Sequence, residues 1–428
     1  MTATRGLTPF FIAAALLAGL VPNAAGAPMT AKLARDTLTV TAEGLSPDEK
    51  FALVFSRQAG SITEWYDLDR DPEMRVNLAA HGSDNGHALF QNRAEMEWEG
   101  KRITLFPGPA EKFVLVEANT VRTVVEISGA MTTATGEFPE EKLREENKTL
   151  TGRSRKGIER PAYATRFVVY PTGRIYIRHT LTFRGLPLFL ASNHAVLATA
   201  PAEKVDAFND HVTEVRALLE PSTFLLHHGE DKDFTASVLL ATDFRRYRVD
   251  WLGQMMTVDG RRRGWVRSAF ALQEGLRVMQ PGDSTWNFLM QIEPSNVDSR
   301  EAARLYVQDY LRPARVTFPG GHGSRVIREL EDRQLDGFAE GRGCYVASAE
   351  GKPAVLMQFD AGTLSRFNPA FEVHDWKPGM PDVIEVDTEP RKRGVHYHAH
   401  LDKQRLLIQY LGVLAPGIHT VRVSGGGD

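Results

Sequence analysis

Hydrophobic and polar residues alternate along most of the chain. The pattern is clearest at residues 51–56, 113–117, 121–127 and 174–183. A period of two places successive side chains on opposite faces, so each stretch is predicted to be a half-buried β-strand. Clusters of Gly, Pro, Asn and Asp separate the stretches and mark turns. The pattern therefore predicts an all-β protein.

The predicted strands fall into two groups, separated by a helix and a flexible segment. Residues 299–311 keep a helical pattern, and Pro313 ends it. The Gly-rich residues 318–323 follow. We therefore predict a large twisted β-sandwich at 28–312 and a smaller β-sandwich of jelly-roll type at 313–428. The second prediction rests on short strands at regular spacing, at 343–348, 354–359, 371–374, 383–386, 394–401, 405–410 and 419–423.

The first 27 residues have the pattern of an export signal. Arg5 precedes an apolar stretch at 6–21, and small residues follow up to Ala27. A basic start, a short apolar core and a small-residue end describe a secretory signal peptide. The alternative is a membrane anchor, but a span needs roughly 20 apolar residues. We predict cleavage near 25–27 and a periplasmic or secreted protein without membrane attachment.

Composition narrows the chemistry that the chain can perform. The formal net charge of −3 gives no argument for nucleic-acid binding, and 42% hydrophobic residues suffice for a core. The single cysteine, Cys344, cannot form an intramolecular disulfide and is expected to be buried. P-loop, G-x-S-x-G, H-E-x-x-H and C-x-x-C motifs are absent from the sequence. We predict no cofactor and no metal, and assign any chemistry to Tyr, His, Arg, Asp and Glu.

Residues 163–180 are predicted to form a β-hairpin around Pro171-Thr172-Gly173. A three-residue loop that starts with Pro and ends with Gly suits a type I turn closed by a left-handed glycine. This loop length sets three opposed pairs, Tyr170 with Arg174, Val168 with Tyr176, and Arg166 with Arg178. One face then carries a polar and aromatic set, Arg166, Tyr170, Arg174, Tyr176 and Arg178. The other face should enter the core with Ile175, Ile177, His179, Leu181 and Phe183.

Two directly opposed arginines repel each other, so something must offset their charge. Carboxylates from a neighbouring strand are one possibility. An anionic substrate held by Arg166 and Arg178 is the other, because guanidinium groups match carboxylate geometry. His179, on the apolar face, is expected to be a hydrogen-bonded core residue.

Other candidate site residues lie outside this hairpin. Asn193 and His194 follow the break at 185–187, and His211 lies in a polar turn, so loops could present them as acid or base. Solvated surface histidines are the alternative interpretation. Glu64 and Trp65 put a carboxylate beside an aromatic ring, as in a sugar-binding wall, whereas the Asp residues that follow are typical of a turn.

A histidine row occurs in the second part of the chain. His396, His398 and His400 alternate, so they would share one strand face. Imidazoles at this spacing could chelate zinc or copper, and an ordinary exposed strand face is the alternative. Because no acidic partner is evident beyond Asp402, we do not predict a metal site.

Three passages resemble the galactose-mutarotase-like sandwiches shared by aldose epimerases and several polysaccharide lyases. They are residues 60–68, 115–125 and 170–177. The second part is similar to jelly-roll modules appended to carbohydrate enzymes. The resemblance implies a large sandwich that acts on carbohydrate. Lyases of this type commonly use a Tyr or His pair with an Arg or Asn that neutralises a uronate, roles that Tyr176, His194, Asn193 and Arg178 would match.

These observations favour an exported polysaccharide lyase that cleaves a uronate-containing glycan by β-elimination. Tyr176 and His194 would transfer protons, while Arg166 and Arg178 bind the carboxylate. One alternative is a hydrolase or epimerase on neutral sugars, using Glu64, Asp67 or Asp69 with a histidine. Another is a glycan-binding protein without catalytic activity. In each case the expected partner is an oligosaccharide or polysaccharide, acidic in the first.

Overall fold

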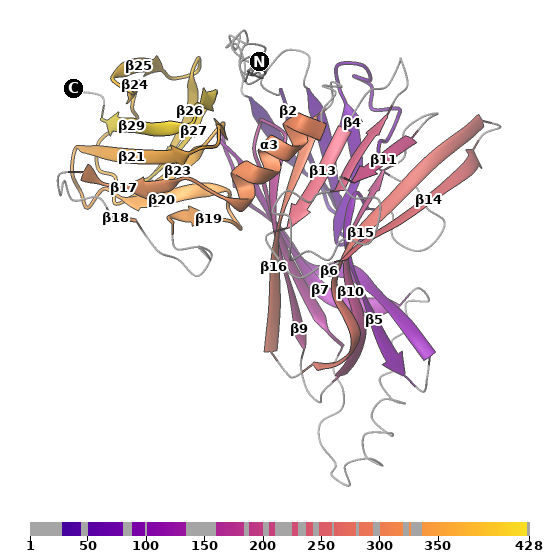
Figure 1. The fold of residues 1–428 in the computed structure, drawn as a ribbon. Coiled ribbons are helices and arrows are strands. Elements are labelled where there is room, and N and C mark those ends of the chain that lie inside the picture. Colours follow the sequence, from indigo (N-terminus) through magenta and orange to yellow (C-terminus); the bar gives the residue numbers. More distant parts are fainter. Residues whose placement is uncertain are drawn as a thin grey trace, which may run out of the picture.

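The computed structural model (Figure 1) describes residues 28–43, 50–79, 88–98, 101–133, 160–183, 188–199, 205–209, 225–229, 237–242, 248–258, 261–279, 282–293, 300–319, 325–326 and 336–425. Within these ranges the regular structure is β-strand apart from a single α-helix, α3 (Arg300–Leu311). The predicted all-β class is therefore confirmed. The predicted signal peptide at 1–27 lies outside the described residues, and no helix in the described ranges is long and apolar enough to cross a membrane.

The described part of the chain begins with a four-stranded antiparallel meander. Its strands follow one another in order: β1 (Met29–Leu33), β2 (Thr37–Ala42), β3 (Phe51–Ser56) and β4 (Ser61–Asp67). Leu38 and Val40 alternate with more exposed threonines on β2, as the period-2 pattern requires. One face of this sheet is therefore apolar and packs on the rest of the fold.

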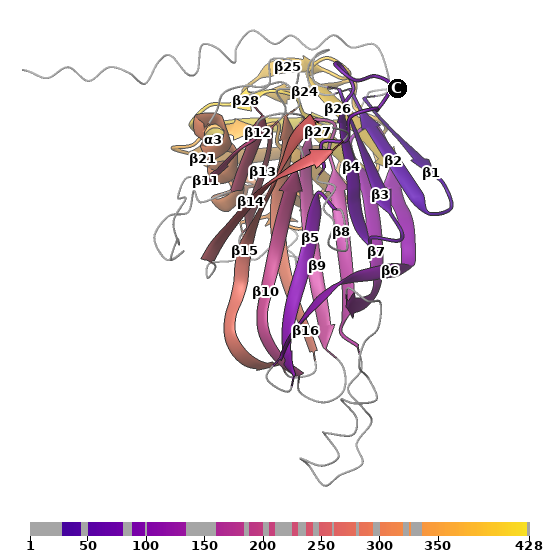
Figure 2. The ribbon, with the colours of Figure 1, turned by 90° about the vertical axis from the view of Figure 1, so that its right-hand side faces the viewer.

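A twelve-stranded antiparallel sheet makes up most of the first part (Figure 2). Its spatial order is β11-β12-β13-β16-β9-β8-β7-β6-β5-β10-β15-β14. The bounds are β5 (Phe90–Trp98), β6 (Lys101–Ala118), β7 (Thr123–Thr133), β8 (Ala162–Val169), β9 (Arg174–Phe183), β10 (Leu188–Thr199), β11 (Val205–Asn209), β12 (Leu225–Gly229), β13 (Ser237–Thr242), β14 (Arg248–Val258), β15 (Arg261–Met279) and β16 (Gly282–Glu293).

The long strand β6 divides this sheet into two layers. Its first residues pair with β5 and the remainder with β7, and register shifts interrupt the second ladder near Pro107 and Ala110. Bulges and an internal proline bend a strand. The layers then face each other: the ring of Phe90 on β5 lies 5.3 Å from that of Phe288 on β16, although the two strands are not neighbours. Their contact, with the meander, forms an inner core that includes Leu53, Phe55, Phe90, Phe167, Ile177 and Phe288.

The predicted hairpin is present with the predicted register. The Cα partners of β8 and β9 include Val168 with Tyr176 and Arg166 with Arg178. Gly173 closes the turn with φ of 76°, in the left-handed region. Ile175 and Ile177 enter the inner core, while Tyr176 points to the opposite side of the sheet, which we call the outer face.

The C-terminal module, which we define as the part after Pro313, consists of two main sheets. One has the order β17-β21-β29-β24-β25 and the other β18-β20-β23-β27-β26, with β20 and β23 parallel. The bounds are β17 (Arg315–Thr317), β18 (Arg325–Val326), β19 (Phe338–Ala339), β20 (Cys344–Ser348), β21 (Ala354–Gly362), β22 (Arg366–Phe367), β23 (Ala370–His374), β24 (Val383–Val386), β25 (Glu389–Lys392), β26 (Tyr397–Asp402), β27 (Arg405–Tyr410), β28 (Val413–Leu414) and β29 (Gly417–Ser424). Strands occur within all seven predicted stretches, and the shortest strands were missed.

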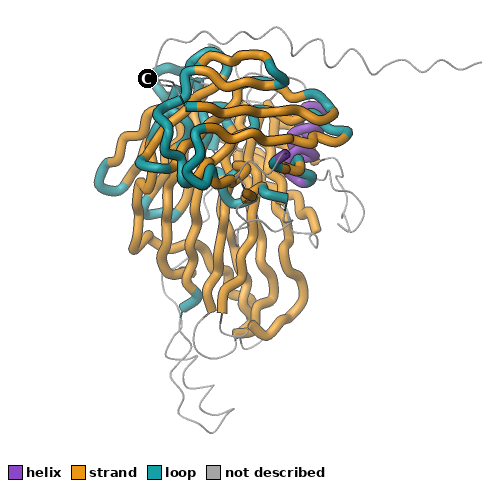
Figure 3. The backbone as a smooth tube through the Cα atoms, turned by 90° about the vertical axis from the view of Figure 1, so that its left-hand side faces the viewer, coloured by secondary structure: helices purple, strands orange, loops and turns teal. Residues whose placement is uncertain are grey.

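The C-terminal module packs on the outer face of the large sheet over one part of the strands' length (Figure 3). A second hydrophobic core fills this contact and draws residues from both sides, among them Val168, Tyr176, Leu289, Tyr345 and Phe371. Helix α3 contributes Val307 and Tyr310. No described strand from before Pro313 pairs with one after it. The two parts thus have separate sheets but share a core.

Candidate functional site

The opposed arginines lie where the cover of the C-terminal module ends. Along β9 the outward side chains change from buried Tyr176 to half-buried Arg178, and along β8 from buried Val168 to half-buried Arg166 and exposed Ala164. Both guanidinium groups are therefore held at one register position on a partly exposed surface.

A carboxylate from the next strand stands beside Arg166. Glu126 on β7 is its direct Cα partner, and Glu126 Oε1 accepts hydrogen bonds from Nε and Nη2 of Arg166 at 3.2 and 3.1 Å. Lys112 donates to the other oxygen at 2.7 Å. These hydrogen bonds, from Lys112 first and then Arg166, hold the pKa of Glu126 below its ordinary value. A carboxylate of the neighbouring strand thus offsets the charge of Arg166, whose side chain remains 32% exposed.

Tyr176 shares the outer face with the arginines, but the second core encloses it. Its ring contacts those of Tyr170, Tyr310 and Phe338 at 5.8–6.2 Å between centroids. Burial raises the pKa of its hydroxyl, and the nearby Arg174 guanidinium only partly opposes this. Desolvation of the hydroxyl therefore outweighs the positive field of the nearby guanidinium group.

The predicted companions of Tyr176 are on other parts of the fold. Asn193 and His194 lie on β10, where their backbones pair with Ala94 and Arg93 of β5. This strand belongs to the layer across the inner core, whereas Tyr176 points away from that core. The side chains of Asn193 and His194, and the whole of His211, lie outside the described structure. The fold therefore does not bring β10 beside the arginine pair.

Trp65 and Glu64 do not form an open sugar-binding wall. The indole of Trp65 is 2% exposed and belongs to the inner core. Glu64 accepts a hydrogen bond from the hydroxyl of Tyr66 at 2.7 Å, on the other side of β4. Asp67 accepts N–H groups of residues 69 and 70, so the acidic stretch is a turn. The pattern of aromatic and acidic residues at 64–69 therefore reflects a core strand followed by a turn, and not a sugar-binding surface.

His179 is the core histidine that its place on the apolar face predicted. Its Nδ1 is hydrogen-bonded to the hydroxyl of Thr165 at 2.7 Å, and its ring stacks against Trp286. The ring is 1% exposed, and burial lowers its pKa to about 3. It is therefore neutral at physiological pH and isolated from any solvent-borne substrate.

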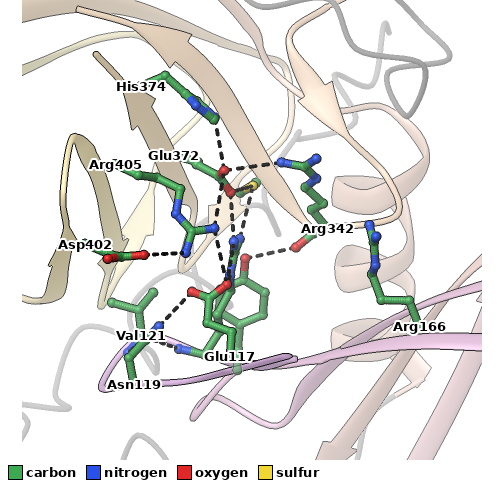
Figure 4. A network of polar contacts seen from close by, with 12 residues as sticks. Glu117, Asn119, Val121, Arg166, Arg342, Glu372, His374, Asp402 and Arg405 are labelled. Carbon is green, nitrogen blue, oxygen red and sulfur yellow. Dashed lines mark hydrogen bonds and ion pairs between the residues drawn. The ribbon is translucent and has the colours of Figure 1, made fainter. Parts of the chain in front are cut away.

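A buried ionic cluster occupies the seam, the contact between the outer face and the C-terminal module (Figure 4). Glu372 on β23 is its centre and is 1% exposed. Glu372 Oε2 accepts a hydrogen bond from Nη2 of Arg122 at 2.8 Å, and this same nitrogen lies 3.2 Å from Glu117. Arg122 belongs to the connection between β6 and β7 of the large sheet, and Glu117 belongs to β6. The carboxylate thus joins the two parts of the chain.

Three half-exposed side chains surround the other oxygen of Glu372. Arg342 Nη1 donates to Oε1 at 3.2 Å, His374 Nε2 lies 3.0 Å from it, and Arg405 Nη1 lies 4.0 Å away. Burial would raise the pKa of Glu372, but the His374 hydrogen bond and the arginine charges outweigh burial and hold it well below its ordinary value. The carboxylate is therefore charged at neutral pH. The residues of the ionic cluster come from distant segments of the chain, at 117–122, 342, 372–374 and 405. No local sequence motif could therefore have predicted the cluster.

The remaining candidate groups are Cys344 and the histidine row. Cys344 is buried beside Glu372, and burial raises the pKa of its thiol to about 12. Of the histidine row, His398 has its pKa lowered to about 4 by burial, and His396 Nδ1 accepts the N–H of Lys392 at 3.1 Å. The described residues contain no group of three His, Cys, Asp or Glu side chains arranged to hold a metal ion.

Comparison with known proteins finds a weak likeness among solved structures. No protein-family model and no curated protein sequence matches the chain. Among solved structures, an aldose 1-epimerase-type protein from Escherichia coli K12 is 9% identical with a TM-score of 0.32, over 57% of this chain and 96% of that protein. A galactose mutarotase-like protein from Lactobacillus casei ATCC 334 is 9% identical with a TM-score of 0.33, over 62% and 100%.

Lyases are found by the same comparison. The heparan sulfate lyase HepC from Pedobacter heparinus is 7% identical with a TM-score of 0.36, over 78% of this chain and 40% of the lyase. The chain thus spans less than half the length of that lyase. The predicted resemblance to galactose-mutarotase-like proteins and polysaccharide lyases is confirmed, and it is weak.

Proposed function

We propose that the protein is an exported carbohydrate-active protein that binds the uronate groups of an acidic glycan and cleaves it by β-elimination. The observation that carries the proposal is the pair Arg166 and Arg178, directly opposed on a partly exposed sheet face. Rigid strands hold both guanidinium groups at one position, and planar guanidinium groups match the two oxygens of a carboxylate.

The reaction depends on neutralising the uronate carboxylate. A base removes the proton at C5, the electron pair forms the C4–C5 double bond, and the C4–O bond breaks as the leaving oxygen takes a proton. Negative charge develops on the carboxylate as C5 loses its proton. Arg166 and Arg178 would stabilise that charge, and Glu126 holds Arg166 in orientation through two hydrogen bonds. Tyr176 is not included as the base because the second core encloses it.

The burial of Tyr176 favours a second candidate function, glycan binding without cleavage. The predicted tyrosine beside the arginines is closed to solvent, and β10, which carries His194, lies across the inner core. The arginine pair would serve equally to bind a carboxylate that is not turned over. The two candidates share the ligand and differ only in the fate of the C4–O bond.

An activity screen separates the candidates. The full-length protein is incubated with uronate-containing and neutral polysaccharides, and three signals are followed: ultraviolet absorbance of unsaturated uronates, new reducing ends, and the dissociation constant. Absorbance confirms elimination. Reducing ends without absorbance indicate hydrolysis and contradict the lyase, and binding alone supports the second candidate. Preference for neutral glycans, or no binding, overturns both.

Substitutions connect the screen to the arginine pair. Arg166→Gln and Arg178→Gln should each lower turnover by about 10²-fold, the usual effect of removing one charge-stabilising donor. Arg422→Gln is the control, because Arg422 is an exposed arginine on the C-terminal module that is also paired with a carboxylate, that of Glu385. Equal activity in all three variants would remove the pair from the mechanism.

A further inference from the structure

A tight turn of the C-terminal module touches the outer face next to the arginine pair. This turn, residues 340–343, connects β19 to β20, and the N–H groups of Arg342 and Gly343 both donate to the carbonyl of Ala339. Gly343 has φ of 67°, and a Cβ placed there would overlap the ring of Tyr176. Glycine is therefore required at this position, because it lets the backbone approach the sheet.

The same turn borders the stem of Arg178. A Cβ added at Gly341 would lie 3.3 Å from Arg178 Cδ and 3.4 Å from Asn287 Oδ1. The hydroxyl of Tyr170 donates to the carbonyl of Arg342 at 2.9 Å. The turn therefore lies close enough to one arginine of the pair that a single added methyl group would touch it, and it is hydrogen-bonded to the sheet beside that arginine.

Glu372 ties this turn to both parts of the molecule. One carboxylate oxygen accepts a hydrogen bond from Arg342, which belongs to the turn. The other oxygen accepts a hydrogen bond from Arg122, which belongs to the large sheet. Cys344, directly after the turn, has its sulfur 3.8 Å from Glu372 Oε2. Hydrogen bonds between charged partners in a buried site are short and directional, so they fix position as well as distance.

We propose that Glu372 is a positioning residue that holds turn 340–343 against Arg178, so that the C-terminal module forms one wall of the arginine site. This inference rests on the proposed function and deepens it, because the site is then incomplete without the module. Loss of the Glu372 charge would leave Arg122 and Arg342 without their shared partner and allow the turn to move. A displacement of about 1 Å near a site can cost up to 10²-fold in rate.

The test uses two kinds of destabilising variant of the full-length protein. One kind is expected to move the turn, and the other is expected to leave it in place. Glu372→Gln and Gly341→Ala alter the turn, and Glu372→Asp keeps the charge. Tyr397→Phe is the control: it removes a buried hydrogen bond to the carbonyl of residue 381, at 2.8 Å, within the same module. Dissociation constants and KM for an acidic glycan are measured well below the unfolding temperature of every variant.

We expect Glu372→Gln and Gly341→Ala to raise KM and the dissociation constant about 3–10-fold, with partial recovery in Glu372→Asp. Tyr397→Phe should lower the unfolding temperature without this change. A merely structural Glu372 would leave KM and the dissociation constant of Glu372→Gln at the wild-type values, which would overturn the proposal. If Glu372→Gln does not fold, Glu372→Asp decides, because its shorter side chain moves the carboxylate away from Arg342; wild-type KM and dissociation constant in that variant would overturn the proposal.

A second measurement does not depend on the ligand. Hydrogen–deuterium exchange should rise within 174–183 in Glu372→Gln and remain at the wild-type level there in Tyr397→Phe. Unchanged exchange in Glu372→Gln would overturn the positioning role even if the glycan is bound. If the wild type binds no acidic glycan, the proposed function fails, while raised exchange still supports Glu372 as the residue that positions the turn.

Discussion

The two faces of the large sheet pack against very different partners. The inner core joins β-layers through aliphatic and aromatic side chains, and its buried imidazole, His179, is neutral. The seam instead combines an apolar core with buried ion pairs. Arg122 with Glu372 and Glu117 forms one group, and Asp309 between Arg174 and Arg366 forms another, at 3.1 and 3.3 Å.

The comparison shows that apolar contacts bring two layers together, whereas buried ion pairs determine how the layers are oriented. Apolar burial is non-directional, so alternation along the strands is sufficient to bring two layers together. A buried ion pair adds little net stability, but a misplaced partner leaves an uncompensated charge. We infer that the charges at the seam select one docking geometry for the C-terminal module. The predictions below test this contrast between the inner core and the seam.

The largest effect is expected at the centre of the seam. Arg122→Ala removes the buried cation between Glu372 and Glu117 and leaves the partly exposed Arg405 near both, so it should lower the free energy of unfolding by about 3–5 kcal/mol. Chemical denaturation measures it. The double variant Arg122→Met, Glu372→Leu removes both charges and should regain much of the loss. A single variant as stable as wild type would show that the pair is not buried as described.

An intermediate effect is expected on the pH dependence of stability, which should differ between His179 in the inner core and Glu372 at the seam. The folded pKa of His179, about 3, lies below its unfolded value of about 6.5, so the unfolded state binds the extra proton. Stability should therefore fall as pH decreases below about 6.5, by about 1 kcal/mol per pH unit. The lowered pKa of Glu372 gives a contribution that is complete above about pH 4.3 and lost only below it.

Unfolding measured from pH 7 to below pH 3 in three proteins separates these windows. His179→Gln should flatten the dependence between pH 6.5 and 5 relative to wild type. Glu372→Gln should keep the wild-type slope there and differ only at lower pH. The same slope in wild type and His179→Gln would contradict a neutral buried imidazole.

The smallest effect is expected on the open part of the outer face. Lys112 pairs with Glu126 at 2.7 Å, but its side chain is 56% exposed. Exposed ion pairs contribute little to stability, about 1 kcal/mol at most. In chemical denaturation, Lys112→Ala should therefore change the free energy of unfolding by less than about 0.5 kcal/mol. Glu126 keeps its contact with Arg166. A loss comparable to that of Arg122→Ala would erase the distinction between seam and surface.

The predicted features that depend on local chain geometry agree with the structure. The turn Pro171-Thr172-Gly173 sets the β8–β9 register, because loop length and a left-handed glycine allow one pairing. The opposed arginines and the two faces of the hairpin follow from that register. Helix α3 ends before Pro313 for an equally local reason, the clash and the missing N–H of proline.

The candidate site could be predicted only in part. Alternation placed Tyr176 beside Arg178, but it could not show that a module more than a hundred residues later would cover one and leave the other half-exposed. The same limit applies to Trp65, whose ring lies in the inner core because the meander packs there. The predicted signal peptide, the export and the glycan remain predictions.

The sequence by itself determined which residues share a face, because strand side chains alternate whatever lies above them. Only the tertiary structure decided what each face meets. Glu372 and Arg122 are 250 residues apart, and neither lies in a local pattern that announces an ion pair. Their contact exists because the second core brings two sheets together, and burial then makes the charges depend on each other. The physical reason is that packing acts between distant segments, whereas periodicity describes only neighbours.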